Sequence, residues 1–255
     1  MRAWIKGKRL DYLCNSSMEK EQIESQSKEI AEYFKNCWTV YVDPAFDRTF
    51  SLRNWATITA TLVLHFNDNK FNKNYNNDKK IIKNNNENNK KIINNNKYNK
   101  NKLESIFKNK KILHIGCGYG YFLEVIKSLN AIPSGIEPYC SFPESLNIIK
   151  AKAEELQDNN SKLSKSLNGE KFDAIVAHDL FLFSIILNRE NAHKIIKSLK
   201  KHLNKNGIMV FENINEETLL EKDNIEKLGF KAEYIENIAN PYGRICSQII
   251  IRNNS

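Results

Sequence analysis

From residue 102 onward, short apolar runs alternate with stretches whose hydrophobic residues recur at helical spacing. The apolar runs predict strands, and apolar residues three and four positions apart predict helices that pack on one side. The predicted strands are Lys111–Ile115, Ser134–Glu137, Asn147–Ala151, Phe172–Ala177, Ile208–Glu212, Phe230–Ile238 and Ser247–Ile251. The predicted helices are Tyr121–Asn130, a polar segment ending near Leu167, Arg189–Leu203 and Glu216–Leu228. This alternation indicates an α/β fold with a seven-stranded, mostly parallel, doubly wound sheet in three α/β/α layers.

Turn residues indicate how several of these elements end. Asn206-Gly207 follows the helix Arg189–Leu203, and a glycine after a helix is typical of a C-terminal cap, so we expect the helix to stop there. Asn240-Pro241-Tyr242-Gly243 predicts a turn between the last two strands, which are therefore expected to pair antiparallel. Between the second and third strands, Tyr139–Leu146 leaves room for only a very short helix.

The first 66 residues have a different pattern. Ser17–Phe34 predicts an amphipathic helix, and Trp38–Val42 is strand-like. Trp55–Phe66 fits two patterns, because its apolar residues alternate as in a strand and also line one side of a helix. We favour a helix that packs on the core as a cover.

Composition separates a third segment from both of these parts. Residues 67–101 consist mostly of Asn and Lys and carry a net charge of +6, out of +9 for the chain. So few apolar residues cannot offset the chain entropy of folding, which predicts a disordered, low-complexity insertion. It is either a tolerated loop expansion or a basic tether for an acidic partner such as RNA. The predicted organisation is an N-terminal cover at 1–66, the insertion at 67–101 and an α/β domain at 102–255.

Several classes of protein are not indicated by the sequence. The cysteines are odd in number, far apart and without a CxxC pair, so neither a disulfide framework nor a zinc site is expected. The longest apolar run, Trp55–Phe66, is too short and polar to span a membrane, and no secretory signal is evident. The default expectation is a soluble cytoplasmic protein, with its oligomeric state left open.

A glycine-rich turn carries the chemistry. The apolar strand Lys111–Ile115 runs into Gly116, Gly118 and Gly120, and a helix follows. Glycines let a ligand approach the backbone closely, and the helix N-terminus favours negative charge. Glu137 ends the next strand, where a carboxylate can accept both ribose hydroxyl protons. Dinucleotide sites prefer GxGxxG/A, but the sixth position here is Tyr121, which is too large for close helix packing.

This GxGxG turn resembles motif I of the class I, Rossmann-like S-adenosylmethionine-dependent methyltransferases, and the resemblance covers roughly residues 102–255. Four further segments match the family in order: Ile136-Glu137-Pro138, Lys152–Leu156, Phe172–Val176, and the helix and turn before Ile208. The resemblance implies that S-adenosylmethionine is bound by residues of the first three motifs: His114, Gly116, Cys117, Gly118, Gly120, Glu137, Pro138, Ala153 and Glu154. His114 stands where the family has an acid, and Lys152 replaces the acid expected at the adenine.

The resemblance also places the residues after the fourth strand near the transferred methyl group. His178 is suited to act as a base near neutral pH, and Asp179 is suited to bind the methionine end or the substrate. An equally simple interpretation of His178 is a loop residue hydrogen-bonded to its neighbours. The expected function is methyl transfer to an O or N atom of a small molecule. The alternatives are an RNA or protein methyltransferase, and a non-catalytic relative that serves as a binding protein.

Overall fold

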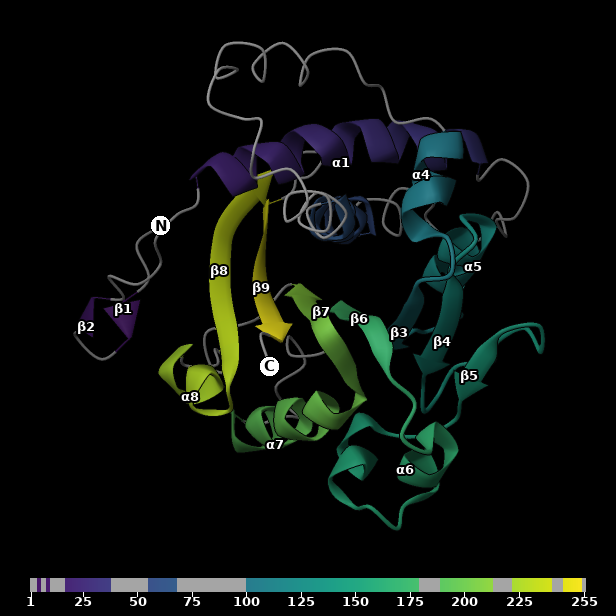
Figure 1. The fold of residues 1–255 in the computed structure, drawn as a ribbon, viewed down its shortest axis with the longest axis vertical. Coiled ribbons are helices and arrows are strands. Elements are labelled where there is room, and N and C mark those ends of the chain that lie inside the picture. The colour runs from purple at the N-terminus through teal and green to yellow at the C-terminus, as the bar shows by residue number, and fades with distance from the viewer. Residues whose placement is uncertain are drawn as a thin grey trace, which may run out of the picture.

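The computed structural model describes residues 4–5, 8–9, 17–37, 55–67, 100–178, 189–212, 222–239 and 245–253. A seven-stranded sheet forms the centre (Figure 1), with the strand order β5-β4-β3-β6-β7-β9-β8. The strands are β3 (Lys111–Ile115), β4 (Ile132–Ile136), β5 (Asn147–Ile149), β6 (Phe172–His178), β7 (Leu203–Glu212), β8 (Phe230–Ala239) and β9 (Ile245–Asn253). Strands β3 to β7 pair in parallel, and β9 pairs antiparallel with both β7 and β8. The predicted fold class is confirmed. A separate two-stranded sheet, β1 (Trp4–Ile5) with β2 (Lys8–Arg9), was not predicted.

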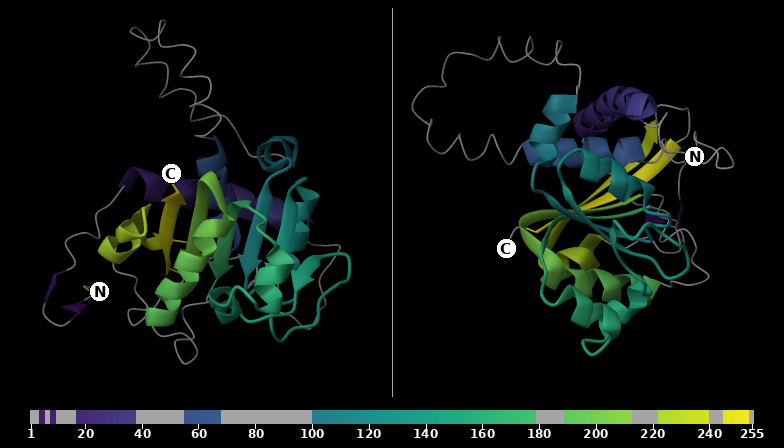
Figure 2. Two further views of the ribbon diagram at one scale, coloured as in Figure 1. Left: turned by 60° about the horizontal axis from the view of Figure 1, so that its bottom comes forward. Right: turned by 90° about the vertical axis from the view of Figure 1, so that its right-hand side faces the viewer.

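Helices cover both faces of the sheet (Figure 2). On one face lie α1 (Ser17–Cys37), a helix at residues 55–67 that we call the cover helix, α4 (Lys100–Phe107) and α5 (Tyr121–Ser128). The other face carries the 3-10 turns η2 (Ala153–Gln157) and η3 (Lys200–His202) and the helices α6 (Lys162–Leu167), α7 (Arg189–Leu199) and α8 (Lys222–Lys227). Two apolar clusters, one on each face, follow from the alternation of side chains along the strands.

Three local expectations need correction. Asn206-Gly207 does not cap a helix, because α7 ends at Leu199, η3 follows, and both residues lie inside β7. Asn206 has a φ of 60°, so the left-handed residue bends a strand here instead of ending a helix. The polar segment before Leu167 is two short pieces, η2 and α6. Between β4 and β5, residues 139–146 form only bends and a turn.

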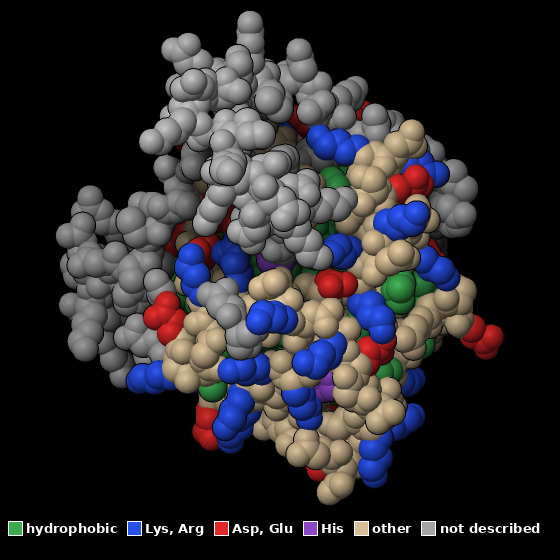
Figure 3. Space-filling model, in the orientation of Figure 1, with side chains coloured by type: hydrophobic (Ala, Val, Ile, Leu, Met, Phe, Trp, Pro, Cys, Tyr) green, Lys and Arg blue, Asp and Glu red, His purple; other side chains and the backbone are tan. Residues whose placement is uncertain are grey.

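Other predictions fall outside the described residues: Trp38–Val42, nearly all of the Asn/Lys-rich segment 67–101 and the turn Asn240–Gly243. The division into three segments stays a prediction. No helix among the described residues is long and apolar enough to cross a membrane. On the face drawn in Figure 3, charged side chains of both signs are spread over the lower part and hydrophobic side chains are visible only in small areas.

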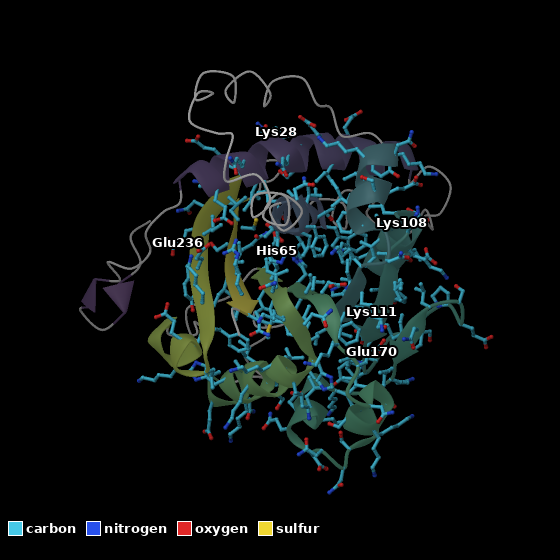
Figure 4. All side chains as sticks on the ribbon, viewed as in Figure 1. Lys28, His65, Lys108, Lys111, Glu170 and Glu236 are labelled. Atoms are coloured by element: carbon cyan, nitrogen blue, oxygen red, sulfur yellow. The ribbon has the colours of Figure 1, made fainter. Side chains whose placement is uncertain are left out.

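The cover helix is buried on nearly every side, and this explains its mixed pattern. Positions 56 to 63 are all buried, including Thr57, Thr59 and Thr61. Nε2 of His65 donates a hydrogen bond of 3.0 Å to the Asn206 carbonyl, and its side chain lies among the crowded central side chains in Figure 4. A helix that contacts protein all round needs no polar side. The predicted helix, and its position against the core, are confirmed.

Arg252 of β9 fastens α1 to the sheet. Its guanidinium bonds Glu19 of α1 at 2.9 Å and Glu233 of β8. Arg252→Met should lower the free energy of unfolding by about 1–2 kcal/mol, because two half-buried carboxylates lose their bonds to the guanidinium. Lys231→Met is the matched control. Lys231 pairs with the same Glu233 but is 58% exposed, so its loss should cost less than about 0.5 kcal/mol in denaturant titrations. Equal effects of the two variants would contradict this account.

Candidate functional site

The glycine turn links β3 to α5 at the point where the strand order reverses. Gly116, Gly118 and Gly120 have φ angles of 69°, 55° and 82°, which side-chain-bearing residues rarely adopt. The amides of Gly116 and Cys117 donate to the Ile136 carbonyl at 2.8 and 3.2 Å, so the turn is tied to the end of β4. Ligands of open α/β sheets bind in the crevice outside the carboxyl ends of the strands at such a reversal.

Glu137 fastens this turn from the neighbouring strand. Its carboxylate is buried and accepts hydrogen bonds from three backbone amides: Gly118 at 2.9 Å, Tyr139 at 2.8 Å and Cys140 at 3.2 Å. Its own amide donates to the Ile149 carbonyl of β5 at 3.1 Å. The structure therefore brings Glu137 and the glycine turn together, as the sequence predicted. Pro138, the next residue, is partly buried beside them.

The space around Gly118 differs from that around Gly120. A Cβ on Gly118 would meet no heavy atom within 4 Å, so the turn faces open space there. A Cβ on Gly120 would lie 2.5 Å from Cδ1 of Leu146 and 3.1 Å from Cδ1 of Ile148. Gly118 therefore leaves room for a ligand, whereas Gly120 allows α5 to pack against the segment before β5.

This contrast gives a pair of matched variants. Gly120→Ala should cost about 2 kcal/mol of folding free energy, through overpacking and the left-handed backbone. Gly118→Ala should cost only about 1 kcal/mol, from the backbone alone, but should weaken ligand binding about tenfold by occupying the open space. Denaturant unfolding and calorimetry measure the two quantities. Equal losses of stability in the two variants would contradict the difference in packing.

His114 is buried in β3 beneath the turn and is 3% exposed. Neither ring nitrogen has a hydrogen-bond partner, and the ring packs edge-on against Phe122 with centroids 5.3 Å apart. Burial, assisted by the nearby His178, lowers the pKa of His114 to about 3. The ring is therefore neutral at physiological pH and cannot supply the negative charge of the acid expected at this position in the family that the sequence resembles.

The remaining predicted cofactor residues lie at the same edge of the sheet. Ala153 is buried and Glu154 is partly exposed, both in η2, which follows β5. Cys117 is buried in the turn, with its Sγ so close to Gly135 that a Cβ there would lie 2.6 Å away. Burial raises the pKa of the Cys117 thiol to about 12, so it packs as a small apolar side chain and is not a nucleophile.

The two predicted catalytic residues follow on the next strand. His178 is the last residue of β6, directly beside the glycine turn, because Ala177 of β6 is paired with Ile115 of β3. Its Nδ1 lies 4.0 Å from Oε2 of Glu212. Asp179 lies outside the described residues.

Sequence reasoning missed the buried polar group beside His178. Glu212 ends β7, opposite His178 in the parallel register and opposite Gln248 of β9. Thr57 of the cover helix donates to both oxygens of Glu212, at 2.7 and 2.9 Å. An acid at the end of an apolar strand was visible in Ile208–Glu212, but its contact with Thr57 was not, since the two are 155 positions apart in the chain. In the parts of the chain that are described, no group of three His, Cys, Asp or Glu side chains could hold a metal ion.

Comparison of the sequence with known protein families identifies the family of this chain. The family model described as a methyltransferase domain matches residues 83–250, more than half of the chain. No curated protein matches the sequence.

Among solved structures, similar chains include a SAM-dependent methyltransferase from Archaeoglobus fulgidus, with 19% identity over 60% of this chain and 92% of the other, at a TM-score of 0.42. Magnesium protoporphyrin IX methyltransferase from Synechocystis, solved with bound SAM, is 10% identical over 94% of this chain and all of the other, at a TM-score of 0.45. On the family match, the chain belongs to the methyltransferase domain family and is an S-adenosylmethionine-dependent methyltransferase.

Proposed function

We propose that this methyltransferase transfers the methyl group to an O or N atom of a small molecule. The observation that carries the proposal is the position of the cover helix. Thr57 bonds Glu212 at the carboxyl end of β7, and Thr61 donates at 2.7 Å to Oε1 of Gln248, which is paired with Glu212 on the antiparallel strand β9. This buried helix lies over the sheet beside His178, and such a cover favours a compact acceptor over a nucleic-acid duplex.

The residues around the glycine turn fit S-adenosylmethionine. Gly118 faces open space, Glu137 sits at the end of the adjacent strand, and the two unpaired nitrogens of His114 lie behind the turn. We propose that Glu137 accepts from the ribose hydroxyls, and that the turn Gly116–Gly120, with Cys117, holds the methionine side. Pro138, Ala153 and Glu154 line the adenine side. When bound, the cofactor supplies an electrophilic methyl group on a sulfonium sulfur.

We assign the proton chemistry to His178. Methyl transfer to an O–H or N–H group releases a proton, and a positioned base that takes it aids the reaction. His178 ends β6 next to the glycine turn, which puts its ring at the edge where the cofactor is expected. Asp179 stays a proposed contact to the substrate or the methionine end. The exposed rings of Tyr119 and Tyr139, 44% and 67% accessible, flank the turn and offer apolar contact area to an acceptor.

The test has two stages. Calorimetry with S-adenosylmethionine and S-adenosylhomocysteine should give micromolar binding by the wild-type protein. Methyl transfer from labelled S-adenosylmethionine is then measured to a panel of small phenols, amines and carboxylic acids, and separately to total RNA and protein. Label in the small acceptors supports the proposal. Label confined to RNA, with strong salt dependence and loss on deletion of Lys70–Lys100, would replace it with the tethered RNA enzyme.

A further inference from the structure

Glu212 is an unusual residue, because a carboxylate side chain is fully buried at the carboxyl end of β7, next to His178. Thr57 donates to both of its oxygens, and Nε2 of Gln248 approaches Oε2 at 3.4 Å. The titratable groups facing this cluster come from three strands: His178 of β6, Cys246 of β9 and, behind His178, His114 of β3. No lysine or arginine of the described chain pairs with Glu212.

A buried carboxylate is costly unless it is hydrogen-bonded and paired with a cation. Thr57 supplies a strong hydrogen bond, and the long contact from Gln248 supplies a weaker one. His178, 11% exposed and 4.0 Å away, is the one ion-pair partner of Glu212 within the described residues. His114 cannot share this role, since burial keeps its ring neutral at physiological pH.

We propose that Glu212 is a positioning residue for His178, held in place by Thr57, and that it stabilises the imidazolium formed when His178 takes the acceptor's proton. In this step an N–H bond forms on His178 as the acceptor's O–H or N–H bond breaks. The positive charge then lies beside the Glu212 carboxylate. The catalytic meaning of this pair rests on the proposed function, but the pairing itself does not. Through Thr57, the cover helix is thereby part of the acid–base site.

Carbon-13 NMR of full-length protein labelled at its histidines tests the pairing without any acceptor. The His178 signal is assigned by its loss in His178→Gln, and its titration midpoint is followed with pH. In Glu212→Gln we expect the midpoint to move to lower pH by about one to three units, because an opposite charge at this distance favours the protonated ring. The isosteric amide can still accept from Thr57, so the polar contact is kept while the charge is removed.

Thr57→Val and Thr59→Val form a matched pair on the cover helix. Both hydroxyls are buried, but the Thr59 hydroxyl has no hydrogen-bond partner in the described structure. Thr57→Val should shift the His178 midpoint in the same direction as Glu212→Gln, because an ionised Glu212 loses its strongest donor. Thr59→Val should leave the midpoint within about 0.2 units of the wild type, since it touches neither member of the pair.

An unchanged His178 midpoint in a folded Glu212→Gln variant would overturn the proposal. If that variant does not fold, the proposal is tested by comparing Thr57→Val with Thr59→Val. Equal His178 midpoints in these two variants would overturn the proposal. Calorimetry with S-adenosylmethionine on the same samples reports separately on the proposed function. A protein that shows the midpoint shift without binding the cofactor keeps the pairing and loses the methyl-transfer role.

Discussion

Glu137→Ala should weaken the binding of S-adenosylmethionine by somewhat more than a hundredfold. Two hydrogen bonds from ribose hydroxyls to a carboxylate would be lost, together worth about 3 kcal/mol. The carboxylate also holds the amides of Gly118, Tyr139 and Cys140, so the turn itself is expected to lose its fixed shape. Isothermal calorimetry on folded protein measures the effect directly.

Glu155→Ala is the matched control for this prediction. Glu155 also accepts from a backbone amide at the same edge of the sheet, that of Lys152 at 2.9 Å, but it is not among the proposed cofactor ligands. Its removal should leave the Kd within about threefold of the wild type. Glu137→Ala protein that is folded by circular dichroism and binds the cofactor normally would show that the ribose is held elsewhere.

The second large effect expected is a loss of stability in mild acid. Burial lowers the pKa of His65 to about 4 and that of His114 to about 3, both from an ordinary value of 6.5. Between these values and 6.5 the unfolded chain binds the protons and the native protein does not, so stability falls as the pH falls. Each histidine contributes a slope of about 1.4 kcal/mol per pH unit, and together they should remove about 4 kcal/mol by pH 5.

The variant His114→Leu removes one of these two protonation sites, so the contribution of His114 to the pH dependence of stability can be measured by difference. Burial raises the pKa of Glu212, so on acidification the native protein binds this proton at a higher pH than the unfolded chain does. This protonation makes stability rise as the pH falls, opposite to the effect of the two histidines. The total slope is therefore less informative than the difference between variants. Denaturant unfolding at pH 7.5, 6 and 5 should show a slope about 1.4 kcal/mol per pH unit shallower in His114→Leu than in the wild type. A parallel slope would mean that His114 is protonated inside the native protein.

The α/β domain was largely predictable because each of its elements has a local signature. The strand before Gly116 is a nearly continuous apolar run that is buried on both faces, as is typical of parallel strands, and Glu137 follows the next strand at the expected spacing. The end of α7 was not predictable from Asn206-Gly207, since a left-handed residue suits a helix cap and a strand irregularity equally well. Which of the two forms depends on the pairing of β7 with β6 and not on the local sequence.

The contacts of Glu212 and Gln248 with the cover helix could not be predicted from the sequence for a different reason. Contacts between Thr57 and Glu212, and between Thr61 and Gln248, join segments more than 150 positions apart. The local sequence does not show which buried threonine of a helix forms a hydrogen bond. Thr57 donates to Glu212, whereas the hydroxyl of Thr59 has no hydrogen-bond partner in the described structure. Only the docking of the cover helix onto the sheet assigns them different roles.

The docking of the cover helix also bears on how the chain assembles. Its apolar residues, such as Ile58 and Leu62, belong to the same cluster as Ile112 of β3 and Val210 of β7. A polypeptide cut once between residues 67 and 100 would keep both sides of that apolar interface, one on each fragment. Such fragments are suited to reassociate, as in a split-protein reporter. In the uncut chain, the covalent link sets the effective concentration of one part relative to the other. This effective concentration depends only weakly on the length of the link.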